Sequence, residues 1–147
     1  MPMDNLNQIK IISRLFYCIV LSDNKVLAAE MHKFFEQVES IINHYFKELD
    51  YDQAILEDQI KFVHHTANIL NPKGNIDKTT GYFLVSIAEA VEDRDFRINL
   101  INQSLSIAIA DNRIAFRESD FIRKLSILWD LEEEFERSLS LILSLSD

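Results

Sequence analysis

Four carboxylates stand at matching places in a short motif that occurs twice in this chain. Asp23 opens the sequence Asp-Asn-Lys-Val and is followed by Glu30, and Asp111 opens Asp-Asn-Arg-Ile and is followed by Glu118. Converging carboxylates repel one another unless a cation or protons lie between them, and their oxygens are the ligands that hard divalent ions prefer. Because the motif contains no histidine or cysteine, it predicts a site for Ca²⁺, Mg²⁺ or Mn²⁺ rather than Zn²⁺.

The same acids also have a purely structural interpretation. Each motif indicates a tight turn between two helices, in which Asn24 or Asn112 can take the left-handed conformation that ends a helix. Glu30 and Glu118 then fall in the first turn of the following helix, where a carboxylate favours the positive end of the helix dipole. That positive end also opposes a bound cation. The sequence leaves open whether the four acids bind a ligand or only shape the turns.

Other residue types capable of chemistry give no second site. There is no Glu-x-x-His, no His-Glu-x-x-His and no glycine-rich phosphate loop. His64 and His65 are adjacent, so on a helix they diverge by about 100° and indicate a solvated face, and His32 and His44 are isolated. The single cysteine, Cys18, lies in an apolar run and is expected to be buried. We therefore expect neither an enzyme active site nor an organic cofactor.

Composition sets the fold class and the kinds of partner. The chain has 147 residues, of which 48% are hydrophobic and 27% charged, and it has only two glycines and two prolines. So few turn residues favour long helices over sheets. The net charge of −9 repels nucleic acid and anionic membranes, and it suits cations or a basic protein partner. With no basic start followed by an apolar segment, and no apolar run long enough for membrane insertion, we expect a cytoplasmic protein of undetermined oligomeric state.

Apolar residues recur at helical spacing along the whole chain. They predict an all-α, compact bundle of about seven helices in a single domain covering residues 1–147. The main break is the loop at 71–77, which divides the chain into halves at approximately 1–70 and 78–147, each containing one helix-turn-helix motif. Thr79 or Thr80 is expected to cap the helix after this loop. The expected helices cover residues 6–19, 31–49, 56–70, 84–91, 98–108, 121–129 and 135–143.

The second copy of the motif resembles a known family. The stretch 107–114, with Glu118 and an apolar helix reaching Leu128, is similar to the signature of the TerB-like (tellurite-resistance) family, an Ala-x-x-Asp-Gly-x-Ile/Val stretch with a glutamate one turn later. The first copy, from Ser22 to Glu30, is similar. The resemblance implies an internally duplicated, all-helical, non-enzymatic domain of about seven helices, linked to tellurite and other stress responses.

The resemblance also implies a metal site, since some members of that family are thought to bind a divalent ion through the acids of both repeats. In this sequence those acids are Asp23, Glu30, Asp111 and Glu118. The chain departs from the family pattern at several positions. These departures weaken the interpretation as a metal site more than the interpretation of the fold. Asparagine stands where the turns have glycine, and the residue before the second helix, normally Ser, Thr or Asp, is Leu or Ala. The alternative is a pure protein-protein interaction module whose repeated acids are only structural.

Overall fold

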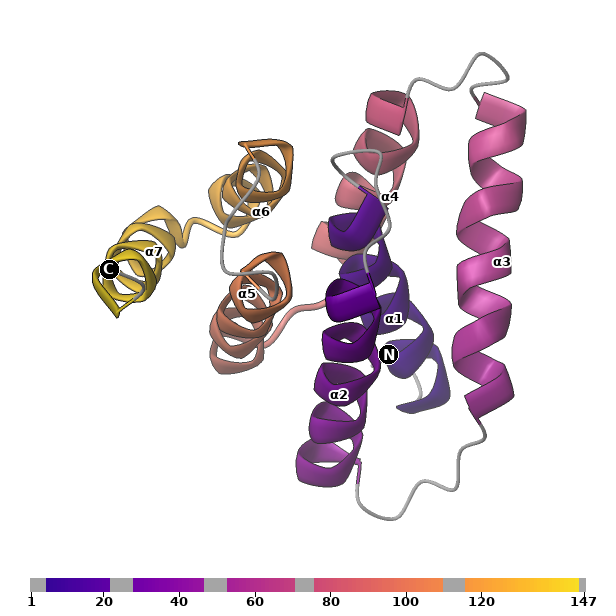
Figure 1. Cartoon of the computed structure of the whole chain (residues 1–147), viewed down its shortest axis with the longest axis horizontal. Helices are drawn as coiled ribbons and strands as arrows, with labels where there is room; N and C mark the ends of the chain where they lie inside the picture. Colours follow the sequence, from indigo (N-terminus) through magenta and orange to yellow (C-terminus); the bar gives the residue numbers. More distant parts are fainter. Residues whose placement is uncertain (1–4, 22–27, 47–52, 71–75, 110–115, 146–147) are drawn as a thin grey trace.

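The computed structural model describes residues 5–21, 28–46, 53–70, 76–109 and 116–145, apart from some side chains at helix ends. These residues form seven helices, and no strand occurs among them. The prediction of an all-α bundle is therefore confirmed (Figure 1). The helices are α1 (Asn5–Leu21), α2 (Ala28–Tyr45), α3 (Gln53–Leu70), α4 (Ile76–Ala90), α5 (Arg94–Ala108), α6 (Phe116–Leu128) and α7 (Glu132–Leu145).

Helix α1 is the centre of the molecule. It contacts α2, α3, α4, α5 and α6. Every residue from Leu15 to Leu21 is buried, so this half of the helix presents apolar side chains in all directions. A helix that is apolar all round is stable only when other elements cover every side of it. The apolar run before the first acidic motif therefore supplies the helix on which the other elements pack.

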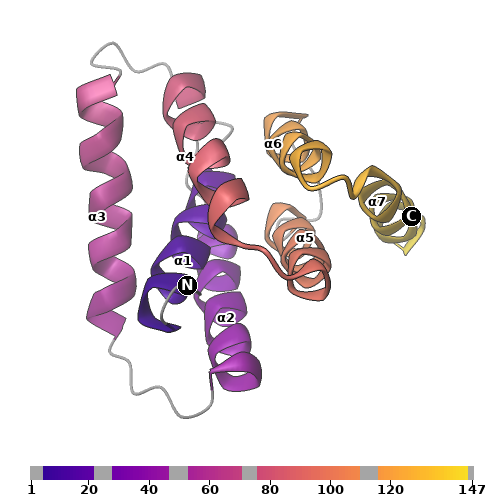
Figure 2. The same cartoon turned by 180° about the vertical axis from the view of Figure 1, so that it is seen from behind.

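The remaining helices lie in two groups around α1. Helices α2, α3 and α4 run roughly along α1, whereas α5, α6 and α7 are seen nearly end-on at one side of the molecule (Figure 1). The view from behind gives the same grouping (Figure 2). The groups are joined where α5 packs on α1 and α2, and where α6 packs on α1 and α4. One continuous core of buried side chains results.

The contacts between helices follow the repeat seen in the sequence. Helix α1 contacts α2 and α3, and in the same way α5 contacts α6 and α7. The two sets also cross: α1 contacts α6, and α5 contacts α2. A duplicated three-helix unit gives this pattern, with α1, α2 and α3 corresponding to α5, α6 and α7. The correspondence is incomplete. Helices α6 and α7 touch, whereas α2 and α3 share no close contact within the described ranges.

Several helix ends differ from the sequence expectations or add detail to them. Helix α2 ends at Tyr45, after Asn, His and Tyr, which have low helix propensity, and the expected end at Leu49 lies outside the described residues. Thr79 and Thr80 lie inside α4, which begins at Ile76, so neither caps it. Thr79 is fully buried against the core, a position that an exposed cap cannot occupy. The expectation of a threonine cap is therefore wrong.

Two other helix ends show well-formed caps. Asp93 precedes α5, and its side chain accepts a hydrogen bond of 2.8 Å from the backbone N–H of Phe96. At the end of α6, Asp130 has a φ of 57°, in the left-handed region. The backbone N–H of Leu131 donates a hydrogen bond of 2.8 Å to Ser126 O. This bond closes the last turn of the helix, and the chain continues into the core at the buried Leu131.

Candidate functional site

Glu30 is the predicted site residue whose side chain the structure describes. It is the third residue of α2, in the first helical turn as expected, and its exposed fraction is only 1%. It stands four residues before Phe34 and eight before Val38, both buried, so it continues the core-facing stripe of α2. The carboxylate therefore lies at the inner side of the helix start rather than on its solvent side.

The second motif glutamate has the same place in its own helix. Glu118 is the third residue of α6. It precedes buried Ile122 by four residues and buried Ser126 by eight, which repeats the spacing of α2. Its side chain lies outside the described residues. The backbone register thus gives the two glutamates equivalent positions at the starts of α2 and α6.

The other half of the predicted site is not described. Asp23 and Asp111 both fall in ranges outside the described residues, as do the turn asparagines. Among the side chains that are described, no group of three or more His, Cys, Asp or Glu residues is arranged to hold a metal ion. The divalent-cation site formed by the four acids stays a prediction.

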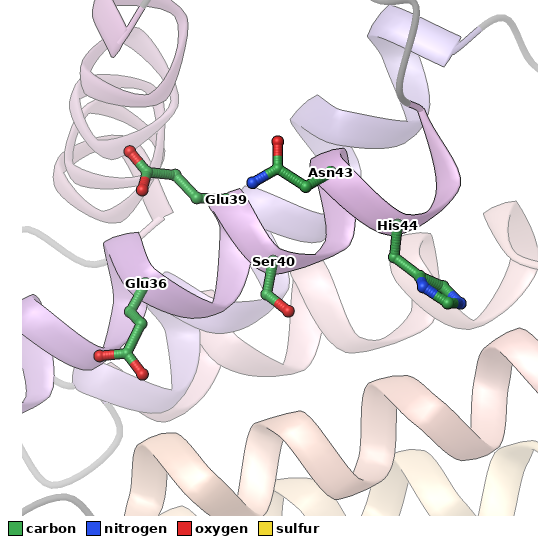
Figure 3. Close-up of a pocket in the computed structure, with 5 residues that line it drawn as sticks. All are labelled: Glu36, Glu39, Ser40, Asn43 and His44. Atoms are coloured by element: carbon green, nitrogen blue, oxygen red, sulfur yellow. The ribbon is translucent and has the colours of Figure 1, made fainter.

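An acidic surface that the sequence did not single out lies on the outer side of α2. Glu36, Glu39, Ser40, Asn43 and His44 line a wide, open hollow, and their side chains leave the one helix in different directions (Figure 3). Glu36 lies within 3.1 Å of Lys33 Nζ, so part of its charge is already balanced. An open surface of this kind excludes no water and holds no group in a fixed orientation. It lacks the enclosure that catalysis requires.

The histidine pair lies on an exposed face of α3, as the sequence predicted. His64 also has a partner within the fold, since its Nε2 lies 2.6 Å from the hydroxyl of Tyr17 on α1, with the two rings edge to face. Burial raises the pKa of Tyr17, with a smaller contribution from Cys18, so the phenol keeps its proton at neutral pH. The hydroxyl therefore keeps a proton that it can donate to Nε2 of His64. This bond links α1 to α3.

Cys18 behaves as a small hydrophobic residue, as predicted. It is fully buried, and this burial raises the pKa of the thiol far above its ordinary value, although the nearby Arg14 acts in the opposite direction. A thiol with a raised pKa carries almost no thiolate at neutral pH, and thiolate is the nucleophilic form. Cys18 therefore supplies no reactive group to a site.

Comparisons with known proteins add no candidate. The chain matches no family model, no curated protein and no solved structure. Of the helices that the structure describes, none is both long enough and apolar enough to cross a membrane. The functional proposal consequently depends on the residues themselves.

Proposed function

We propose that the chain is a non-enzymatic, TerB-like helical domain of a cytoplasmic stress-response system, and that its two acidic turns bind a divalent cation or a basic protein partner. The observation that carries this proposal is the burial of Glu30 on the core-facing stripe of α2. An ionised carboxylate loses much of its hydration when buried, so cations, hydrogen-bond donors or a proton must compensate it. The proposal assigns part of that compensation to a bound partner.

The repeat makes a shared site reasonable. Glu118 has the register of Glu30, and each glutamate follows an aspartate across a turn of the same sequence, Asp23 in one copy and Asp111 in the other. Four carboxylate groups offer enough oxygens for a hard ion that takes six or more ligands. The net charge of −9 further favours cations over anions around the molecule.

The alternative function is a protein-protein interaction module in which the four acids are only structural. Glu30 lies in the first turn of α2, where the helix dipole alone stabilises a negative charge. In that case the acidic outer side of α2, around Glu36 and Glu39, is the surface offered to a basic partner. This alternative requires no metal and predicts no effect of metal on stability.

Thermal unfolding with millimolar Ca²⁺, Mg²⁺ or Mn²⁺ tests the proposal. An ion present at about 100 times its Kd stabilises the folded state by about 2.7 kcal/mol, which raises Tm by several degrees for a domain of this size. The double variant Asp111→Asn, Glu118→Gln should lose this shift while keeping its helical circular dichroism. As a matched control, Glu36→Gln with Glu39→Gln removes the same charge from the exposed side of α2 and should keep the shift.

Three results separate the functions. A shift that only the motif variant loses supports a metal site. An unchanged Tm with all three ions, together with loss of a co-purifying basic partner in the motif variant, supports docking at the turns. If the motif variant unfolds in metal-free buffer and the control does not, the acids are structural and the proposal fails.

A further inference from the structure

Arg14, on the central helix α1, is held by neutral groups. Its Nε donates a hydrogen bond of 2.8 Å to Oε1 of Gln59, a buried amide on α3. Its guanidinium carbon lies 4.2 Å from the centroid of the Phe62 ring, one turn further along α3. In the described part of the chain no carboxylate forms an ion pair with it. Within the described ranges, the arginine thus has a fixed place but no neutralising carboxylate.

Another arginine of the same fold shows that stacking on a ring does not require this isolation. Arg123 also lies over an aromatic ring, that of Phe135, at 5.6 Å. It nevertheless has Glu136 within 3.6 Å of its guanidinium. The chain contains 24 acidic residues against 15 lysines and arginines, so carboxylates are abundant. Arg14 nonetheless lies where no described carboxylate reaches it.

The charge on Arg14 is also partly desolvated. Burial is the largest influence on its pKa and lowers it, while Tyr82 and Cys18 raise it. Guanidinium stays protonated in proteins, so the lowered pKa expresses an unfavourable environment rather than a loss of charge. The thiol of Cys18 keeps its proton because burial raises its pKa, so it does not cancel the charge. An oxyanion arriving at this guanidinium would therefore gain a charge-assisted hydrogen bond with little competing protein charge.

The remaining geometry favours a flat, partly apolar ligand. Because Nε bonds Gln59 and the guanidinium carbon lies over the Phe62 ring, the group is held at two points, and its two terminal nitrogens can offer two parallel hydrogen bonds. Phe62 on α3 is 39% exposed and Tyr82 on α4 is 53% exposed. Both rings contact Phe83, at 6.0 and 5.2 Å between centroids. Exposed aromatic surface therefore lies beside the arginine. The three residues belong to α1, α3 and α4, which pack against one another, and Figure 2 shows these three helices.

We propose that Arg14, Phe62 and Tyr82 form a binding site for a small organic oxyanion, a carboxylate or a phosphate monoester, whose apolar body lies against the two rings. Arg14 binds the oxyanion through its terminal nitrogens, and the rings cover the rest of the ligand. The net charge of −9 disfavours polyanions such as nucleic acid but only weakly opposes one singly or doubly charged molecule. This proposal does not depend on the function proposed for the acidic turns.

Titration with four probes tests the proposal: benzoate, phenyl phosphate, acetate and inorganic phosphate. The readout is the NMR signal of the Arg14 Nε–H, which the bond to Gln59 protects from rapid exchange. Benzoate or phenyl phosphate should give a saturable shift at millimolar concentration, and the matching probe without a ring should bind about tenfold more weakly because it lacks contact with the aromatic rings. The aromatic probe that saturates at lower concentration identifies the oxyanion as carboxylate or phosphate.

Variants show whether the binding belongs to this site, with shifts of α3 and α4 backbone signals as the readout. Arg14→Lys keeps the positive charge but removes the pair of terminal guanidinium nitrogens, and it should weaken binding of the aromatic probe about tenfold. Tyr82→Ala changes an exposed residue, so it should fold normally and weaken the aromatic probe while leaving acetate unchanged. Arg123→Gln is the control, since it removes a ring-stacked arginine elsewhere and should leave binding intact. Lack of saturation by all four probes, undiminished binding in Arg14→Lys, or equal loss in Arg123→Gln would overturn the proposal.

Discussion

The buried thiol of Cys18 makes the stability of this protein sensitive to alkaline pH. In the unfolded chain the thiol ionises near its ordinary pKa of about 9, but burial holds the folded-state pKa well above that value. Below pH 9 both states are protonated and the group has no effect. Above pH 9 the unfolded state loses a proton that the folded state keeps, so the free energy of unfolding falls by about 1.4 kcal/mol per pH unit. By pH 10.5 the loss is about 2 kcal/mol.

Urea denaturation from pH 7.5 to 10.5 measures this loss, with Cys18→Ala as the reference. The variant is less stable at every pH because of the space it leaves in the core, but it lacks the thiol, so its free energy of unfolding should decline less steeply above pH 9. The other ionisable groups are common to both proteins, so their effects cancel in the difference. Tyr17, whose pKa is also raised by burial, adds a further decline in both proteins above about pH 10. If the wild type and Cys18→Ala show parallel profiles, the thiol is not protected and the reasoning is refuted.

Three further substitutions test the packing and the caps. Asp130→Gly should stabilise the protein by up to about 1 kcal/mol in thermal unfolding, because glycine takes a φ of 57° without strain; a lower Tm would contradict this account of the α6 end. Phe34→Ala, in the fully buried part of α2, should cost about 3–5 kcal/mol in urea, and a loss below 1 kcal/mol would show a looser core. Trp129→Phe removes the 3.0 Å bond from the indole N–H to Ala88 O and should cost about 1–3 kcal/mol, whereas an unchanged midpoint would mean that water replaces that bond.

The sequence predicted the helices well because each depends on local spacing. The apolar run at 15–21 predicted the burial of Cys18, since a run apolar in all directions must be covered on all sides. The expectation for Thr79 failed for the opposite reason. A threonine after a loop fits a cap by local rules, and only the packing of α4 on α1 and α6 decides that the helix starts at Ile76 and turns this residue inward.

Contacts between distant helices lay beyond sequence reasoning. His64 bonds Tyr17, and Arg14 bonds Gln59, because α1 and α3 pack together with a particular register. No periodicity within either helix specifies that register. Glu30 is an intermediate case. Its spacing of four residues from Phe34 was visible in the sequence and indicates an inward position, although the first-turn placement alone suggested an ordinary dipole role.

Other helix starts in the same protein show what that dipole role requires. Asp95 in the first turn of α5 is exposed, and so are Glu132 and Glu133 in the first turn of α7. These acids interact favourably with the helix dipole while they stay hydrated, so the interaction has no desolvation cost. Glu30 has the same position along its helix but is buried at 1% exposure, an arrangement that the dipole does not need and that desolvation opposes. The buried position of Glu30 therefore has a desolvation cost that its place at the helix start does not explain.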